Sequence, residues 1–295
     1  MKQIQRVHHG APVRLSQLLA TLTGLGQSDV STLIAMGGAY LGKLRCKDPN
    51  HMIRRGDLVA AFYRQPLIME PVPFNPQWIV EDKGGILIAN KPSGMPTQGR
   101  RDADYMAFYE VLKQHLDGYL GLHHRLDQDT SGLMLFARDR ALNKDIARAF
   151  QERLVHKQYL AVVSGGWPFS EEDVIIKDPI GAFNTPQGRR HGVMKNGKEA
   201  QTRVRLLAES EGLLLVSAKP LTGRTHQIRI HLSKHGMPLR GDTWYGGPAG
   251  SGFQLHCCGL AWPKTGGLAA GNYQLSPPQS WRDNLPQELL GGLSC

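Results

Sequence analysis

Long hydrophobic runs are absent from this sequence. Its longest apolar stretches, such as those at 85–89 and 213–216, are far shorter than the roughly 20 residues that a membrane-spanning helix requires. The first residues also lack the apolar stretch and small-residue cleavage site of a secretory signal. We therefore expect a cytoplasmic protein with no membrane partner.

Cysteine is scarce, with four residues in a chain of 295. This number is too small for a disulfide scaffold, and Cys257-Cys258 is an adjacent pair rather than the spaced pairs of a zinc site. We expect buried or incidental thiols. The neighbouring His123 and His124 would point to opposite faces of a strand, which does not favour a shared metal ion. The sequence thus predicts neither a metal nor a cofactor.

Acidic residues are outnumbered, because 35 Lys and Arg face 25 Asp and Glu, for a formal net charge of +10. The first partner to expect is therefore a polyanion, with nucleic acid ahead of a membrane surface. The imbalance is strongest in residues 1–64, which hold nine basic residues and three acidic ones. We predict a small basic module there, ahead of a larger and more neutral body.

Within residues 1–64 the pattern predicts two short helices followed by strands. Leucines at 15, 18, 19 and 22 share one helical face. A second face begins at Val30 after the possible cap Ser28-Asp29 and ends before Gly37-Gly38. Strand-like segments follow at 39–44 and 52–59. This order resembles a helical RNA-binding domain of a small-subunit ribosomal protein, but the second helix lacks its basic residues, so a simple packing domain is the alternative.

Proline marks the end of this module. Residues 65–77 are predicted to be a linker, because the dense prolines Pro66, Pro71, Pro73 and Pro76 are incompatible with a helix or a central strand. Residues 78–295 then form the main domain. It alternates strand-like runs, predicted at 85–89, 132–137, 159–163, 202–207, 213–218 and 227–232, with helices at 105–116 and 141–154. This uneven alternation predicts an α+β fold with a mixed, largely antiparallel sheet and flanking helices.

Two segments of the main domain carry chemistry. In the first, polar and small residues at 123–132 form a loop directly before an apolar strand, a place where reactive groups are commonly held. Arg125 could bind a phosphate there while Asp127 meets the substrate. The second segment is 221–232. If 227–232 is a strand, Arg229 lies on its polar face, and Arg224 in the preceding turn is free to reach a buried acid.

Five motifs then stand in one order, and together they resemble the RluA-type pseudouridine synthases. They are Asn-Lys-Pro-Ser-Gly at 90–94, the His-Arg-Leu-Asp motif at 124–133, Lys-Gln-Tyr-Leu-Ala-Val-Val at 157–163, Gly-Arg-Thr-His-Gln-Ile-Arg at 223–229, and the segment from Gly236 to Tyr-Gly at 245–246. The resemblance covers residues 78 to about 262. It implies a pseudouridine synthase fold and the isomerisation of uridine in RNA, with base flipping and no metal or other cofactor.

The resemblance also assigns roles to residues. Asp127 corresponds to the catalytic carboxylate, which either attacks the nucleotide or removes a proton from the ribose 2′ carbon. Arg224 corresponds to the arginine that pairs with this acid and keeps it ionised, and Tyr159 to the aromatic residue that stacks on the base. Arg125 would fill the gap left by the flipped nucleotide, and Leu255 would line the base pocket. Three further side chains are expected to bind RNA, namely Lys91, His124 and Arg229.

Two rival functions stay open on the sequence. One is an RNA-binding protein of this fold without catalysis, and the other is a glycoside hydrolase that uses Asp127 and Asp129 as a pair. The basic segments 189–191 and 195–198 are either solvated loops or an RNA clamp. Ribosomal RNA is the favoured partner, transfer RNA the next, and a monomer the default state.

Overall fold

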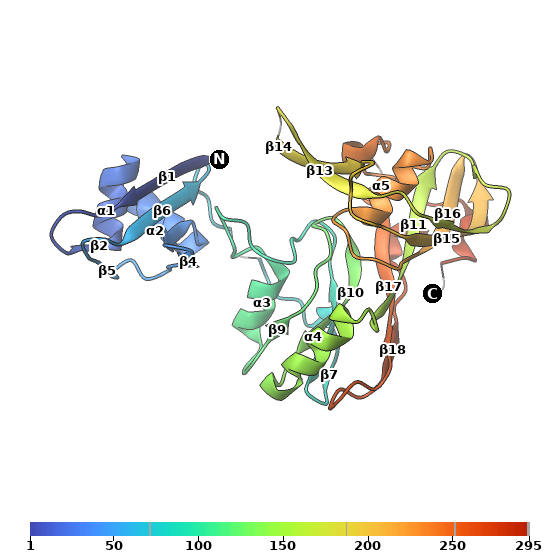
Figure 1. Ribbon diagram of the computed structural model, residues 1–295, viewed down its shortest axis with the longest axis horizontal. Helices are drawn as coiled ribbons and strands as arrows, with labels where there is room; N and C mark the ends of the chain where they lie inside the picture. Colours follow the sequence, from blue (N-terminus) through green and yellow to red (C-terminus); the bar gives the residue numbers. More distant parts are fainter. Residues whose placement is uncertain (71, 187, 251, 294–295) are drawn as a thin grey trace. The chain divides into compact units, whose positions relative to one another are not determined.

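The computed structural model describes every residue except 71, 187, 251 and 294–295. It divides into two compact units (Figure 1), one made of residues 1–75 with 95–117, the other of 76–94 with 118–295. The sequence predicted a module at 1–64, a linker at 65–77 and a main domain at 78–295, whereas the first unit runs to residue 75 and also includes residues 95–117. Of the predicted linker prolines, Pro71 lies outside the described residues.

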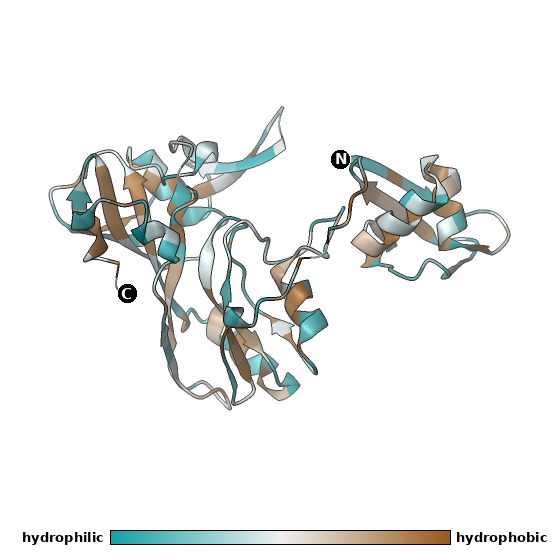
Figure 2. Ribbon diagram, turned by 180° about the vertical axis from the view of Figure 1, so that it is seen from behind, coloured by the Kyte–Doolittle hydropathy of each residue, from teal (hydrophilic) through white to brown (hydrophobic). Residues whose placement is uncertain are grey.

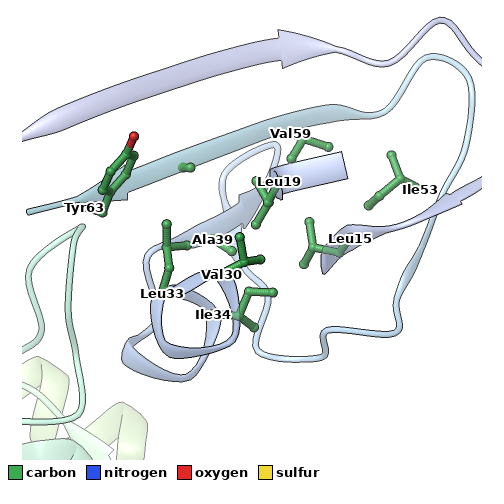
Figure 3. Close-up of a cluster of buried hydrophobic side chains, with 10 residues drawn as sticks. Leu15, Leu19, Val30, Leu33, Ile34, Ala39, Ile53, Val59 and Tyr63 are labelled. Atoms are coloured by element: carbon green, nitrogen blue, oxygen red, sulfur yellow. The ribbon is translucent and has the colours of Figure 1, made fainter. Parts of the chain in front are cut away.

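The first unit is a small sheet with helices packed on it. Its strands follow the order β1-β6-β3-β4. Their bounds, with those of the short β2–β5 pair, are β1 Lys2–Val7, β2 Val13–Arg14, β3 Ala39–Leu41, β4 Leu44–Arg45, β5 Met52–Ile53 and β6 Leu58–Tyr63. The helices are α1 Leu15–Thr23, α2 Gln27–Met36 and α3 Phe108–His115. Residues from α1, α2 and β6 form its core (Figure 3), including Leu15, Leu33 and Val59.

The second unit is built on a ten-stranded sheet in the order β12-β15-β16-β11-β17-β10-β8-β7, with β9 beside β10 and β18 beside β17. The strands of this unit are β7 Ile79–Lys83, β8 Ile86–Lys91, β9 Gly121–Leu122, β10 Ser131–Ala137, β11 His156–Ser164, β12 Asp173–Ile176, β13 Ile180–Thr185, β14 Gly188–Val193, β15 Thr202–Ser210, β16 Leu213–Pro220, β17 Leu255–Trp262 and β18 Gly271–Gln274. Its helical segments are η1 Pro76–Trp78, η2 Arg140–Leu142, α4 Asn143–Gln151, α5 Gln227–Lys234, η3 Thr243–Tyr245, α6 Gln279–Arg282 and α7 Gln287–Leu290.

The pairings confirm the predicted mixed, largely antiparallel sheet. β10 and β17 run parallel, whereas the other ladders of this sheet are antiparallel. The central strands are largely hydrophobic (Figure 2), and β10 is buried along its whole length. Near the C-terminus, Trp281 and Leu289 pack with Leu160 and Leu215 of the sheet. In the described part of the chain no helix is both long and apolar enough to cross a membrane.

The parallel contact between β10 and β17 depends on Gly132. Its φ is +112°, a conformation that other residues rarely adopt, and a Cβ there would come within 2.3 Å of the Cys257 carbonyl oxygen. Only glycine lets the two backbones approach this closely. The approach fixes the start of β10, and therefore the loop that precedes it, against the centre of the sheet.

Several local predictions are wrong. Residues 227–232 form helix α5 rather than a strand. Helix α2 begins after Gly26, so Ser28 and Asp29 lie inside it and do not cap it. The basic segment 189–191 belongs to strand β14, which pairs with β13, rather than to a loop. Cys46 and Cys257 are free, as expected, but Cys258 is disulfide-bonded.

Candidate active site

A cavity of about 310 Å³ opens beside the loop that precedes β10. Its wall comes from this loop, from β11, from the segment between β16 and α5, and from the start of β17. Most of the residues predicted for the site line it, namely His124, Arg125, Asp127, Tyr159, Arg224, Arg229 and Leu255. Among the described residues that line the cavity, Asp127 is the only acid, since Asp129 lies outside its wall.

Lys91, the last residue of β8, holds the Asp127 loop through hydrogen bonds to its backbone. Lys91 is fully buried, and its Nζ donates hydrogen bonds of 2.8 Å to the carbonyl oxygens of Pro92 and Gln128. Burial lowers the pKa of Lys91 to about 7, while Asp129 and Asp127 work in the opposite direction. The ammonium group of Lys91, predicted to bind RNA, is thus buried and hydrogen-bonded to the backbone of the loop.

Replacing Lys91 with Met is expected to loosen this loop. The apolar chain fills a similar volume but leaves the Gln128 and Pro92 carbonyls without their donor, and unmade buried hydrogen bonds to a charged group cost about 2–4 kcal/mol together. We expect the urea midpoint of unfolding to fall and the catalytic rate to fall with it. An unchanged midpoint and rate in Lys91→Met would show that the loop does not need this support.

Asp127 has a cationic partner, and it is Arg229 of helix α5. Arg229 Nη1 lies 3.4 Å from Asp127 Oδ2, while its Nε and Nη2 donate to the two oxygens of Asp242 at 2.7 and 2.8 Å. Asp242 is buried, so this two-pronged pair fixes the guanidinium plane. The guanidinium also packs on the rings of Tyr245 and Phe253, at 4.9 and 5.2 Å from their centroids. Arg229 is thus held rigidly where it meets the carboxylate.

Arg224 does not fill the place that the motif comparison gave it. Its Nε donates to the carbonyl of Glu199 at 2.8 Å, and its backbone N–H donates to Gln227 Oε1. It lines the cavity but makes no ion pair with Asp127. In helix α5 Arg229 is buried, and it is Arg229 that lies within ion-pair distance of Asp127.

The turn before α5 is held by the side chain of Gln227. Its amide accepts from Thr222 Oγ1 at 2.7 Å and donates to Thr202 Oγ1 at 2.9 Å. The next residue back, His226, has the left-handed φ of 56°, which places its ring beside the acid. The turn therefore owes its shape to a buried amide rather than to a glycine.

His226 links Asp127 to a second hydrogen-bonded chain. Its Nε2 lies 3.9 Å from Asp127 Oδ1, and its Nδ1 lies 2.8 Å from Tyr245 Oη. Tyr245 donates to the carbonyl of His191 at 3.2 Å, so Nδ1 of His226 is the donor to Tyr245. Burial lowers the pKa of His226, with Asp127 opposing the shift. Sequence reasoning missed this ring, although it lies within the motif at 223–229.

Another part of the cavity wall carries an aromatic and an aliphatic side chain, Tyr159 and Leu255. Tyr159 on β11 is buried, and burial raises the pKa of its phenol well above the usual value. Leu255, the first residue of β17, is also buried and lines the same cavity. A phenol ring and an aliphatic side chain give a surface suited to a flat, weakly polar ring. Arg125 stands exposed in the same wall.

His124 braces the loop from inside the domain. It is buried, stacks on Phe150 with ring centroids 4.8 Å apart, and accepts a 3.0 Å hydrogen bond from the Leu135 N–H. Its stacking and hydrogen-bond contacts are therefore internal ones, although it also lines the cavity. His123 bonds Asn143 instead, so the two histidines have separate partners. In the described part of the chain no cluster of three possible metal ligands occurs.

These buried histidines predict a pH dependence of stability. Burial lowers the pKa of His124 to about 3 and that of His256 to about 4. Both values lie below the unfolded value of about 6.5, so the unfolded chain binds more protons in acid. The free energy of unfolding should fall as the pH drops below about 6.5, by up to about 1.4 kcal/mol per pH unit for each histidine.

Urea unfolding at pH 7, 6 and 5 measures this slope, above the range where ordinary carboxyl groups titrate. In His124→Gln the amide oxygen can still accept from Leu135 but does not titrate, so the slope should become shallower by up to about 1.4 kcal/mol per pH unit. If the slope is the same in this variant and in the wild type, the histidine account is wrong.

The family model described as RNA pseudouridylate synthase matches residues 85–234. Among curated proteins, the ribosomal large subunit pseudouridine synthase C of Pasteurella multocida is 32% identical over 241 residues, covering 78% of this chain and 73% of its own. An uncharacterized RNA pseudouridine synthase of Aquifex aeolicus is 30% identical, covering 80% of this chain and 78% of its own.

Solved structures give the same picture of the fold. The human RNA pseudouridylate synthase domain containing 1 superposes with a TM-score of 0.59 at 28% identity, covering 71% of this chain and 87% of its own. The human domain containing 4 gives a TM-score of 0.56 at 24% identity, covering 68% and 88%. The family model spans β8 through α5, the stretch that carries Lys91, Asp127, Tyr159 and Arg229.

Proposed function

This chain belongs to the RNA pseudouridylate synthase family and isomerises uridine in RNA to pseudouridine, and on that premise we propose that Asp127 is the carboxylate that reacts with the flipped nucleotide. The observation that carries the proposal is the cavity itself, in which Asp127 is the only acid among the described lining residues and is paired with Arg229. The fold, the family match and the named relatives favour the enzyme over an RNA-binding protein without catalysis.

The chemistry needs few groups. The bond between ribose C1′ and the ring N1 breaks, a bond from C1′ to ring C5 forms, the C5 proton leaves to solvent, and N1 takes up a proton. A single well-placed carboxylate serves either as the nucleophile or as the base at the ribose 2′ carbon. Arg229 orients this carboxylate, and Asp242 in turn holds Arg229. No redox step or metal is required by this balance.

Binding of the target base falls to Tyr159 and Leu255 in the cavity wall. Tyr159 and Leu255 offer ring and aliphatic contacts in exchange for the stacking that a base loses when it leaves a helix, a cost of a few kcal/mol. Arg125, exposed in the cavity wall, is placed to fill the gap that the nucleotide leaves. Because the phenol of Tyr159 stays protonated, we assign it a contact with the base rather than proton transfer.

We further propose that the substrate is ribosomal RNA. The relative from Pasteurella multocida is named for the large ribosomal subunit, and a second such relative, from Haemophilus ducreyi, is 31% identical over 248 residues. The basic charge of residues 1–64 suits an RNA partner. The enzyme is then expected to act in the cytoplasm, as a monomer.

Mapping pseudouridines in cells with and without the gene tests the substrate. Total RNA is separated into ribosomal and transfer fractions, and each uridine is scored for modification. We expect at least one pseudouridine of large-subunit ribosomal RNA to be lost without the gene and restored by the wild-type chain. Loss confined to transfer RNA would overturn the ribosomal assignment and leave the isomerase activity in place.

A further inference from the structure

An exposed tryptophan lies next to the catalytic network. Trp244 is the middle residue of η3, which Asp242 precedes and Tyr245 ends, and 56% of it is exposed to solvent. The other four tryptophans of the chain are half-buried or buried. The Trp244 ring meets the His226 ring edge to face, with centroids 6.0 Å apart, and His226 contacts Asp127. The exposed Trp244 ring thus contacts His226, and His226 in turn lies beside Asp127.

A basic side chain accompanies this ring. The Arg190 guanidinium of β14 lies over Trp244, 5.2 Å from the ring centroid. In the described part of the chain Arg190 makes no ion pair or side-chain hydrogen bond, so its donors are available. Directly across the hairpin, Phe183 pairs with Arg190 and is 42% exposed. The hairpin is tied to the site because the His191 carbonyl accepts from Tyr245.

We propose that Trp244 is the stacking platform for a base adjacent to the isomerised uridine, and that Arg190 binds the phosphate of that nucleotide. This inference rests on the proposed function, since it assumes that the target uridine enters the Asp127 cavity. Single-stranded RNA is recognised by aromatic stacking combined with arginine contacts, and such stacking tolerates any base. More than half of Trp244 remains exposed with Arg190 in place, so ring surface is left for a base.

The platform explains a feature that the fold alone does not require. A tryptophan is among the largest apolar side chains, and exposing it forfeits the burial that usually stabilises it. Its ring interactions in the described part of the chain include those with Arg190 and His226. A neighbouring nucleotide that stacks here would be held in register with the catalytic acid through His226 and Tyr245. Trp244 is therefore a binding residue rather than a catalytic one.

Kinetics with three variants test the proposal. The substrate is ribosomal RNA from cells lacking the gene, labelled with tritium at C5 of uridine, and the readout is KM and kcat for tritium release. Trp244→Leu should raise KM about 5- to 100-fold, because it keeps an apolar side chain but removes the stacking face. Trp244→Phe should stay within about 5-fold of the wild type. Trp167→Leu, a half-buried tryptophan outside the cavity, is the matched control and should leave KM unchanged.

Other kinetic outcomes overturn the platform. An unchanged KM in Trp244→Leu means that no base stacks there. A lower kcat at unchanged KM means that Trp244 instead organises His226 and Tyr245. If the wild type itself releases no tritium from any RNA, the proposed function fails. A binding measurement then still tests whether a base stacks on Trp244.

That measurement uses tryptophan fluorescence. The probes are a ten-nucleotide oligouridylate and an abasic RNA of the same length and charge. The emission of Trp244 is the difference between the wild-type spectrum and that of Trp244→Phe. Stacking should quench this difference when oligouridylate is added, and the abasic chain should leave it unchanged. Equal quenching by both probes, or equal quenching in both proteins, would show that the ring meets only charge or a different partner, and would overturn the inference.

Discussion

Asp127→Asn is expected to lower the rate of tritium release from uridine-labelled RNA by about 10⁴-fold or more, the scale seen when an enzyme loses its reacting side chain. Asparagine has the shape of aspartate but is neither a nucleophile nor a base under these conditions. Its amide oxygen can still accept from Arg229, so the loop and the cavity should keep their form. RNA affinity, measured separately by filter retention, should change by less than about 10-fold.

The matched control is Asp129→Asn, the same substitution two residues along the loop. Asp129 lies outside the cavity wall, and we expect this variant to retain at least about a tenth of the wild-type rate. Comparable losses in the two variants would favour a pair of carboxylates, as in a glycoside hydrolase. Full activity of Asp127→Asn would remove this residue from the mechanism.

Arg229→Gln is expected to have the second largest effect, because it harms both stability and catalysis. The side chain of Arg229 is 7% exposed and that of Asp242 only 2%. Removing the guanidinium leaves Asp242 buried without its partner, which costs about 3–5 kcal/mol of unfolding free energy. It also takes away the cation that orients Asp127. The urea midpoint should fall clearly at an unchanged m-value, and kcat should fall by more than about 100-fold.

Two further variants separate these effects. Arg229→Met combined with Asp242→Leu removes both charges, so most of the stability should return while the activity stays low. Arg224→Gln removes the arginine that the motif comparison favoured, and its effect on kcat should be small beside that of Arg229→Gln. The opposite order of the two arginines would restore the original assignment and contradict the geometry.

The position of the site could be predicted from the sequence, but the hydrogen bonds and ion pairs between its side chains could not. Asp127, Tyr159 and Leu255 were found because they occupy fixed places in motifs that adjoin buried strands. The fold class followed from the uneven alternation of strand-like and helical segments. Both kinds of information are local, so they survive without knowledge of the packing.

Helix α5 shows where local information fails. Ile228, Ile230 and Leu232 alternate with polar residues, a period of two that indicates a half-exposed strand. In the structure all six residues from 227 to 232 are buried, so the alternation does not report exposure. The polar members are buried with tertiary partners, Asp242 for Arg229 and Thr202 for His231. The residues of this segment do not by themselves indicate those partners, and the choice of Arg224 over Arg229 rested on the motif resemblance rather than on packing.

Lys91 and His124 illustrate the same limit for charged residues. Both belong to motifs beside a basic cleft, and a lysine or histidine there is normally assigned to the phosphate backbone. Their burial follows from long-range contacts with Gln128 and Leu135. These contacts shape the loop that presents Asp127. Such residues support the site through the backbone.

Analysis of the product nucleosides is the most direct test of an isomerase built around one carboxylate. RNA incubated with the wild-type chain is digested completely, and the nucleosides are separated by chromatography and weighed by mass spectrometry. We expect one nucleoside with the mass of uridine and the mobility of pseudouridine for each tritium released, and none with Asp127→Asn. Free uracil, or an abasic ribose in the RNA, would contradict the account, because the base would then have left the cavity instead of turning within it.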